Sequence, residues 1–146
     1  MNTDYWDKDG ATKVFTHELS SKWVEDIPLA RTVLDFGCGY GRITKQLHSL
    51  GFKNIIGYDP SRMMISRAIA ENNGPKYTSQ IGEVLKHKYG LVICFALFTS
   101  CPEPEGQLEI KEIIEKQTFG TSRMYISDYL TSENPHYFEK YEQKAL

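Results

Sequence analysis

The apolar positions of the chain follow two different periods, which predict alternating strands and helices. Short runs rich in β-branched and aromatic residues predict strands at 32–36, 54–58, 76–79, 91–95 and 123–127. Apolar residues spaced three and four positions apart predict helices at 42–50, from Ser61 onward and at 106–118. The run at 91–95 is apolar throughout, which is typical of a strand buried on both faces of a parallel sheet.

The N-terminal region is predicted to be an arm followed by a helix. Residues 1–11 are polar, except for the pair Tyr5 and Trp6, and are expected to form a loop. From Thr12, apolar residues recur every four positions, which predicts a helix that ends at 26–28. The residues on its apolar face are Phe15, Leu19 and Trp23.

Local signals mark the ends of two of the predicted helices. Gly51 follows the helix at 42–50 and suits the left-handed conformation that commonly ends a helix. Ser61 is predicted to be the N-cap of the helix after the second strand, and the breaker cluster 72–75 follows that helix. The buried side of this helix is predicted to consist of Met64, Ile65, Ala68 and Ile69.

The alternation of strands and helices predicts an α/β fold with a Rossmann-like, doubly wound and mainly parallel sheet of about five strands. Ligands of such sheets bind outside the carboxyl ends of the strands. The 146 residues suffice for one domain, which we expect to span 1–146. This domain would include an N-terminal arm and helix at 1–28 and a polar, aromatic tail at 129–146.

Composition and charge narrow the possible functions. The chain has 17 basic and 19 acidic side chains and a formal net charge of −2, which argues against broad electrostatic binding of nucleic acid. The basic triplet 86–88 is too short to indicate more than a solvated turn. The longest apolar run, 91–98, is far shorter than the about 20 residues that cross a bilayer. The N-terminus lacks the apolar segment of a secretory signal, so we expect a cytoplasmic protein.

The cysteines and histidines form no pattern typical of metal sites or disulfides. Cys38, Cys94 and Cys101 include no C-x-x-C pair, which fits a reducing cytoplasm. The 4 histidines include no H-x-x-x-H pair. We therefore expect neither a metal site nor a disulfide framework.

The strongest chemical signal is the loop between the first strand and the helix at 42–50. Gly37, Gly39 and Gly41 alternate there, where the backbone must turn sharply and can approach a ligand closely. Arg42 breaks the G-x-G-x-x-G pattern of dinucleotide binding, and the Gly-Lys-Ser/Thr of a phosphate-binding loop is absent. By itself, the loop fits either a ligand site or a tight turn without a ligand.

A second signal follows the second strand. Asp59 ends this strand, where a carboxylate can accept hydrogen bonds from both ribose hydroxyls of a nucleoside. The alternative is an acid that the dipole of the following helix favours at its start. The residue alone does not distinguish these interpretations.

Together, the motifs 35–41 and 57–61 resemble those of the class I S-adenosylmethionine-dependent methyltransferases. The resemblance extends through 91–96 and 124–128 and covers roughly residues 5–130. The family has a seven-stranded sheet whose last two strands form an antiparallel hairpin, and the short tail 129–146 holds no such pair. The fifth strand would then expose an edge, or be covered by the tail or by a second chain. We expect a sheet that forms a homodimer or swaps elements through that edge.

The resemblance implies a cofactor, S-adenosylmethionine, with S-adenosylhomocysteine as its product. It also implies a set of cofactor-binding residues, namely Asp35, Gly37, Cys38, Gly39, Asp59, Pro60, Met64 and Phe95. Asp35 would hold the methionine amino group, directly or through water. Asp59 would bind the ribose hydroxyls, and Phe95 would meet the methionine part. Cys38 is also explained as a small packing residue.

Further implied contacts concern the adenine and the mouth of the site. Pro60 and Met64 would flank the adenine, although Met64 also fits an ordinary helix core. The backbone at 79–81 would meet the adenine edge, with Ser79 or Gln80 where many relatives carry an acid. Tyr5 would close over the pocket as a lid, or would be a surface aromatic on the arm.

Methyl transfer from a sulfonium is a direct displacement that requires positioning more than a catalytic constellation. Asp128, after the fifth strand, is the main candidate for a base or a substrate-orienting group, and a solvated carboxylate at a loop start is the alternative. His136 and Cys101 are weaker candidates.

Three functions are compatible with these residues. The first is a methyltransferase acting on a small-molecule acceptor, with binding to nucleic acid or membrane not expected. The second is a catalytically silent S-adenosylmethionine-binding domain, or a fragment, that acts in an assembly. The third is a nucleotide-dependent oxidoreductase, which Arg42 at the third-glycine position disfavours.

Overall fold

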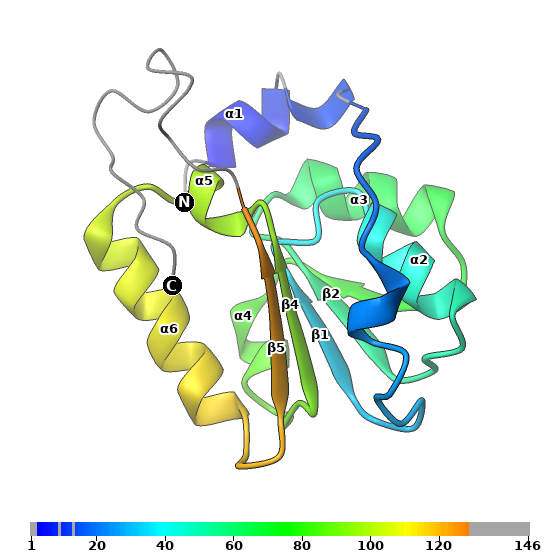
Figure 1. The fold of residues 1–146 in the computed structure, drawn as a ribbon. Helices are drawn as coiled ribbons and strands as arrows, with labels where there is room; N and C mark the ends of the chain where they lie inside the picture. Colours follow the sequence, from blue (N-terminus) through cyan, green and yellow to red (C-terminus); the bar gives the residue numbers. More distant parts are fainter. Residues whose placement is uncertain (1–2, 9, 13, 129–146) are drawn as a thin grey trace.

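The computed structural model describes residues 3–8, 10–12 and 14–128 of the chain. A parallel sheet forms its centre, with five strands in the order β3-β2-β1-β4-β5 (Figure 1). The strands are β1 (Val33–Phe36), β2 (Ile55–Tyr58), β3 (Lys76–Thr78), β4 (Leu91–Phe95) and β5 (Arg123–Ser127). The predicted strands and the parallel α/β sheet are therefore confirmed.

Helices precede, connect and flank the strands. The α-helices are α1 (Thr3–Lys8), α2 (Arg42–Ser49), α3 (Arg62–Glu71), α4 (Ile81–Val84), α5 (Leu97–Ser100) and α6 (Pro104–Gln117). Two short 3-10 helices are η1 (Gly10–Thr12) and η2 (Ser21–Trp23). None of the helices in these described parts of the chain is long and apolar enough to cross a membrane.

Two apolar cores hold the helices against the two faces of the sheet. One core joins β1, β2 and β4 to α4, α5 and α6, and includes Phe36, Val92 and Ile114. The other joins β1, β2 and β4 to α2 and to the segment before β1, and includes Leu19 and Leu47. The strand order reverses between β1 and β4, so the point where ligands bind to such sheets lies at the carboxyl end of β1.

The helix predicted from Thr12 to 26–28 is wrong. Apart from the short η2, residues 14–28 have no regular helix, and Trp23 is 66% exposed. The Gln46 side chain of α2 accepts a hydrogen bond from the Leu19 N–H at 2.9 Å and donates one to the Leu19 carbonyl at 2.6 Å. Leu19 is buried in the core, so a tertiary contact satisfies the backbone groups that a helix would have paired.

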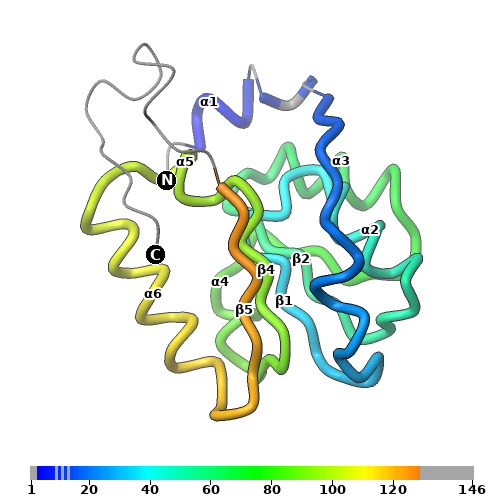
Figure 2. Tube along the Cα trace, in the orientation of Figure 1, coloured from blue at the N-terminus to red at the C-terminus, as the bar shows by residue number. Residues whose placement is uncertain are grey.

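The predicted N-terminal loop is also wrong, because residues 3–8 form α1. Asp7 of this helix accepts a hydrogen bond from the hydroxyl of Ser61, the N-cap of α3. The tube in Figure 2 shows α1 passing above the carboxyl ends of the central strands. The two one-turn helices α4 and α5 were not predicted, because four residues are too few to show a helical period.

The ends of α2 and α3 confirm the predicted caps. The hydroxyl of Ser61 accepts a hydrogen bond from the Met64 N–H at 3.2 Å, and Gly51 has a φ of +106°. Met64, Ile65 and Ala68 are buried as predicted, whereas Ile69 is 57% exposed. Ile69 faces outward beside the edge strand β3, where no further strand of the described residues covers it. Residues 129–146, including His136, lie outside the described residues.

The contrast between the two isoleucines of α3 can be tested by mutation. Ile65→Ala removes buried methyl groups and leaves a cavity, and should lower the free energy of unfolding by about 2–4 kcal/mol. Ile69→Ala, at an exposed position of the same helix, should change it by less than about 0.5 kcal/mol. Urea unfolding of both variants measures the difference, and equal losses would contradict the orientation of α3.

Candidate functional site

The alternating glycines form a tight loop between β1 and α2. Gly37, Gly39 and Gly41 have φ values of +79°, +54° and +86°, which side-chain-bearing residues rarely adopt. A Cβ on Gly37 would lie 2.7 Å from the Leu97 side chain, and one on Gly41 would lie 2.7 Å from the Tyr77 hydroxyl. The positive φ values therefore favour glycine at both ends of the loop, and a Cβ at either position would also force a neighbouring side chain to move.

The loop is hydrogen-bonded to the end of β2. The N–H groups of Gly37 and Cys38 donate to the carbonyl of Tyr58 at 2.8 and 2.9 Å. The Gly39 N–H donates to Oδ2 of Asp59 at 3.0 Å, and the Ser61 N–H donates to Oδ1 at 2.9 Å. The structure thus brings the two sequence motifs into direct contact through one carboxylate.

Asp59 is 8% exposed, and burial raises the pKa of its carboxyl above the usual 3.8. Its bond from the N–H of Ser61, the N-cap of α3, is also compatible with the alternative interpretation of an acid at the start of that helix. An ionised carboxylate has about four lone-pair sites, and the two N–H donors occupy only part of them. Asp59 can therefore hold the loop and accept further hydrogen bonds from a ligand.

Asp35 lies in β1 beneath the loop and is 1% exposed. Its Oδ2 accepts a hydrogen bond from the Thr44 hydroxyl at 2.6 Å. Burial raises the pKa of Asp35 to about 6, with a smaller rise from the negative charge of Asp59. The Thr44 hydroxyl and the positive charge of Arg42 act in the opposite direction. A cation beside Asp35 would offset the cost of burying its charge.

Thr44 was not predicted as a site residue. It is fully buried in α2, next to Ile43 and three residues before Leu47, on the apolar side of the helix. A hydroxyl on a buried face requires a polar partner, and this signal was present in the sequence. The sequence did not show which buried acceptor it would reach.

The end of β4 lies next to the start of α2. Phe95 is partly buried, and the guanidinium carbon of Arg42 lies 5.2 Å from the centre of its ring. Ala96 follows with a φ of +53°, a strained conformation for a residue with a side chain. Its N–H donates to the Ser127 carbonyl at 2.7 Å, which ties the end of β4 to β5.

Met64 and Pro60 lie on the side of α3. Met64 is 2% exposed, and its Cε would lie 3.4 Å from a Cβ on Gly39. It is therefore a buried residue that packs beside the loop, which agrees with both interpretations of its role. Pro60 is partly buried and lies between Asp59 and the Ser61 cap.

Cys38 and Cys101 have the surroundings of packing residues. The Cys38 side chain is buried and lies against Gly57 of β2, where a Cβ on the glycine would be 3.1 Å from the sulfur. Cys101 lies in the core with α6. Burial raises the pKa of both thiols, which disfavours the reactive thiolate.

The Asp128 carboxylate binds backbone at the start of α5. Its Oδ2 accepts hydrogen bonds from the N–H groups of Phe98 at 2.8 Å and Thr99 at 3.3 Å. These contacts give Asp128 a structural task at the carboxyl end of β5. Its assignment as a base or orienting group stays a prediction.

Aromatic residues connect the N-terminal segment to the loop. Tyr5 packs edge-on against Trp6 at 4.9 Å between ring centres, and Phe15 stacks on Tyr40 of the loop at 6.4 Å. The Phe15 N–H donates to the Tyr40 hydroxyl at 2.9 Å. The arm is thus fixed against the glycine loop and covers this end of the sheet (Figure 1).

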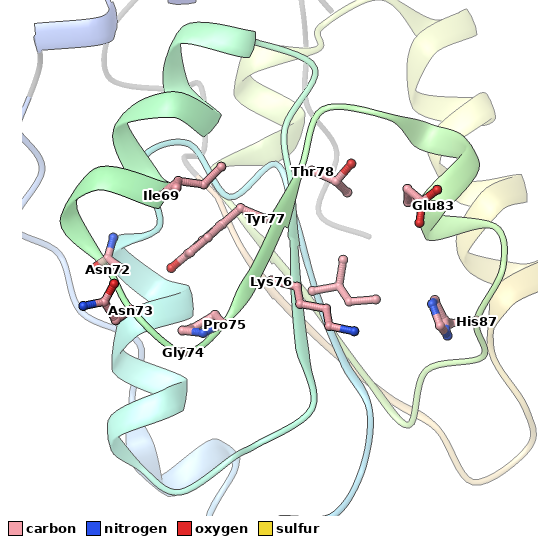
Figure 3. A pocket seen from close by; sticks show the side chains of 11 residues that line it. Ile69, Asn72, Asn73, Gly74, Pro75, Lys76, Tyr77, Thr78, Glu83 and His87 are labelled. Carbon is pink, nitrogen blue, oxygen red and sulfur yellow. The ribbon is translucent and has the colours of Figure 1, made fainter.

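A cavity of about 480 Å³ lies elsewhere, at the outer edge of β3. Figure 3 shows Asn72 and Tyr77 on one side of the strand and Lys76, Glu83 and His87 on the other. Since it lies beside the strand edge rather than over the glycine loop, we do not assign it to the site. Within the described residues, no group of His, Cys, Asp and Glu side chains could hold a metal ion.

Comparison with known proteins gives a family. A family model described as a methyltransferase domain matches residues 11–145. The ribosomal protein L11 methyltransferase of Mannheimia succiniciproducens is 42% identical over 62 residues, which are 40% of this chain and 21% of that protein. The protein of the same name from Aliivibrio fischeri is 25% identical over 131 residues, 78% of this chain and 45% of that protein. The chain thus matches less than half the length of these relatives.

Solved structures share the fold. A SAM-dependent methyltransferase from Methanosarcina mazei has a TM-score of 0.69 at 20% identity, covering 82% of this chain and 61% of that one. Magnesium protoporphyrin IX methyltransferase from Synechocystis, with bound SAM, has a TM-score of 0.57 at 24% identity, covering 76% and 67%. The match of the family model to nearly the whole chain confirms the resemblance inferred from the motifs: the chain belongs to the family of methyltransferase domains.

Proposed function

We propose that this chain binds S-adenosylmethionine over the glycine loop and transfers its methyl group to a small-molecule acceptor, releasing S-adenosylhomocysteine. The observation that carries the proposal is the Gly39–Asp59 hydrogen bond of 3.0 Å. This hydrogen bond holds the Asp59 carboxylate, which has lone pairs left to accept further bonds, beside the glycine loop. Because glycines have no side chains, a ligand can approach the backbone of this loop closely. The residues fit the cofactor, because the Asp35 carboxylate is buried beneath the loop and its bond from the Thr44 hydroxyl uses only part of its acceptor capacity, which leaves lone pairs for an ammonium group.

In this proposal each part of the cofactor has its own contacts. Asp59 accepts hydrogen bonds from the ribose hydroxyls, while Asp35 binds the methionine ammonium group. The backbone of Gly37, Cys38 and Gly39 approaches the methionine part. The remaining contacts are Pro60 and Met64 beside the adenine, the backbone at 79–81 at its edge, and Phe95 beside the methionine part.

The bound cofactor supplies an activated methyl group on a sulfonium. The protein's task is then to position the two reactants and to exclude water, for which no catalytic base is needed unless the acceptor arrives protonated. The N-terminal segment, fixed by the Phe15–Tyr40 stack and the Asp7–Ser61 hydrogen bond, is suited to excluding water. Asp128, which follows the carboxyl end of β5, is the candidate to orient or deprotonate the acceptor.

The acceptor class and location belong to the proposal as well. Among the similar proteins, one is named for a protein acceptor and another for magnesium protoporphyrin IX. The net charge of −2 and the lack of a basic stripe suit neither RNA nor DNA, so the acceptor that we propose is a small molecule rather than a nucleic acid. A reducing cytoplasm is consistent with three free cysteine thiols, all buried.

Calorimetry with S-adenosylmethionine and, separately, with NAD tests the binding function. The chain should bind the first and not the second. Asp59→Ala should weaken cofactor binding by about 1–3 kcal/mol, because a charged hydrogen-bond acceptor for ribose is lost. Glu105→Gln, an exposed acid in α6, is the control and should bind normally.

Three results would each contradict a part of this assignment. Tight NAD binding without binding of S-adenosylmethionine would replace it with a nucleotide-dependent oxidoreductase. Unchanged affinity in a folded Asp59→Ala protein would leave Asp59 as a helix-start acid alone. Binding without methyl transfer to any acceptor tested would favour the catalytically silent domain.

The pH dependence of binding tests the role of Asp35. Its raised pKa means that protonation near pH 6 should remove the charge that binds ammonium, so affinity for S-adenosylhomocysteine should fall as pH decreases below about 6. Asp35→Asn should bind weakly and without this dependence. A wild-type affinity that is constant from pH 7.5 to 5 would contradict the assignment.

The same variant has an expected effect on the free protein. Folding raises the pKa of Asp35 from 3.8 to about 6, so its ionisation destabilises the fold above pH 6, and this penalty disappears as pH falls towards 3.8. Asp35→Asn should therefore raise the melting temperature of the ligand-free protein at pH 7.5 and show less effect at pH 4. A loss of stability at both pH values would show that the carboxylate has a structural role instead.

We also propose a homodimer through the exposed edge at β5. Met124 and Ile126 of this strand are 48% and 36% exposed, and an open strand edge favours association. Sedimentation should show a dimer that Met124→Glu dissociates, while Leu85→Glu, at an exposed apolar position of the chain away from β5, should not. A monomer at high concentration would contradict the proposal.

A further inference from the structure

The cavity at the outer edge of β3 is separate from the site over the glycine loop. Its volume of about 480 Å³ lies within the range of cavities that hold small molecules. In the described part of the chain, its lining includes none of the residues assigned to the cofactor. This edge cavity lies along β3 and the preceding loop 72–75, between Ile69 near the end of α3 and the pair Glu83 and His87.

Apolar surface from three segments lines the edge cavity. Ile56 of β2, Ile69 of α3 and Pro75 contribute aliphatic side chains, and Tyr77 of β3 contributes an aromatic ring. Ile69 is 57% exposed, so apolar area that lines this cavity remains in contact with water. The apolar body of a ligand would cover this area, which is favourable because it removes apolar surface from water.

The protein's own hydrogen bonds hold the walls of the edge cavity. The Asn72 side chain donates to the Tyr40 carbonyl at 3.0 Å, which fixes the loop 72–75 at its start. On the other side of the cavity, the Gln117 side chain donates to the His87 carbonyl at 2.7 Å. A ligand therefore binds between walls that are already ordered, which lowers the entropic cost of binding.

Positive charge lines the side of β3 that carries Lys76. Figure 3 shows Lys76, Glu83 and His87 on this same side of the strand. The Lys86 ammonium lies 2.5 Å from the Glu83 carboxylate and holds the pKa of Glu83 below its usual value, with smaller effects from His87 and Lys76. Within the described residues, Lys76 is in none of the salt bridges. The Lys76 ammonium can therefore bind an anion.

The combination of an apolar lining with a cation points to one class of ligand. We propose that the edge cavity binds a small organic monocarboxylate, with its carboxylate at Lys76 and its apolar body against Ile69 and Tyr77. A single negative charge fits better than two, because Glu83 lies on the same side of β3 as Lys76 and repels a second charge.

An added β-strand from another protein fits this edge poorly. Strand β3 has only 3 residues, so it offers few backbone groups for pairing. It begins directly after Pro75 and carries Lys76, and both residue types disfavour pairing at the edge of a sheet. The occupant that the cavity favours is therefore a small molecule rather than an extended peptide.

NMR titration of the whole chain with two probes tests the proposal. The probes are 3-phenylpropionate and its neutral amide, 3-phenylpropanamide, which share an apolar body and differ in charge. The carboxylate should shift backbone N–H signals within 72–78 and 83–87, and should bind about fivefold more tightly than the neutral probe. Saturating S-adenosylhomocysteine should leave these shifts in place, because the edge cavity is separate from the glycine loop.

Three variants test the two parts of the cavity. Lys76→Gln should weaken binding of 3-phenylpropionate about fivefold and leave binding of the neutral probe unchanged. Lys111→Gln removes the same charge from an exposed lysine of α6, so it is the matched control and should change neither affinity. Ile69→Ala should weaken binding of both probes, because it removes apolar contact and no charge.

Several outcomes would overturn the proposal. One is equal affinity of the wild type for the two probes, and another is an unchanged affinity of the folded Lys76→Gln protein for 3-phenylpropionate. Equal weakening by Lys76→Gln and Lys111→Gln would also overturn it, because the net charge of the protein would then explain the effect. The same holds if neither probe gives saturable shifts in these segments up to about 10 mM, or if S-adenosylhomocysteine abolishes them.

Discussion

The hydrogen bonds of the Asp59 carboxylate connect the parts of the site. One oxygen accepts the N–H of Gly39 in the loop, and the other accepts the N–H of Ser61 at the start of α3. A loop of left-handed glycines has little conformational preference of its own, so these bonds define its path. Ser61 in turn binds Asp7, so the N-terminal helix also depends on this junction.

The same end of the sheet concentrates negative charge. Asp35 and Asp59 are both buried, and burial raises the pKa of each carboxyl, while the charge of Asp7 further raises that of Asp59. Burying like charges together destabilises a fold, and proteins tend to accept such penalties at functional sites. A cationic, hydrogen-bonding ligand would offset this penalty, which is why the acids support a binding function more strongly than the glycines alone.

Much of the sheet and of the site could be predicted from sequence for one reason. Parallel strands end at a common edge, so Gly39 and Asp59, which follow the first and second predicted strands, lie at the same edge of the sheet. Partners that depend on side-chain reach could not be predicted. The sequence indicates that the Thr44 hydroxyl is buried, but it does not show that Asp35 is the acceptor of its hydrogen bond. The contact between Asp7 and Ser61 joins residues 54 positions apart, and no local pattern indicates it.

By itself, the sequence determined the succession of strands and helices along the chain. It also determined the glycine loop, the acid after β2 and the caps of α2 and α3, because each of these features depends on neighbouring residues. Only the tertiary structure decided the path of the N-terminal segment. Leu19 has helical spacing with its apolar neighbours, yet the Gln46 side chain binds both of its backbone groups. Apolar spacing is a local signal, and burial of Leu19 against the sheet outweighed it.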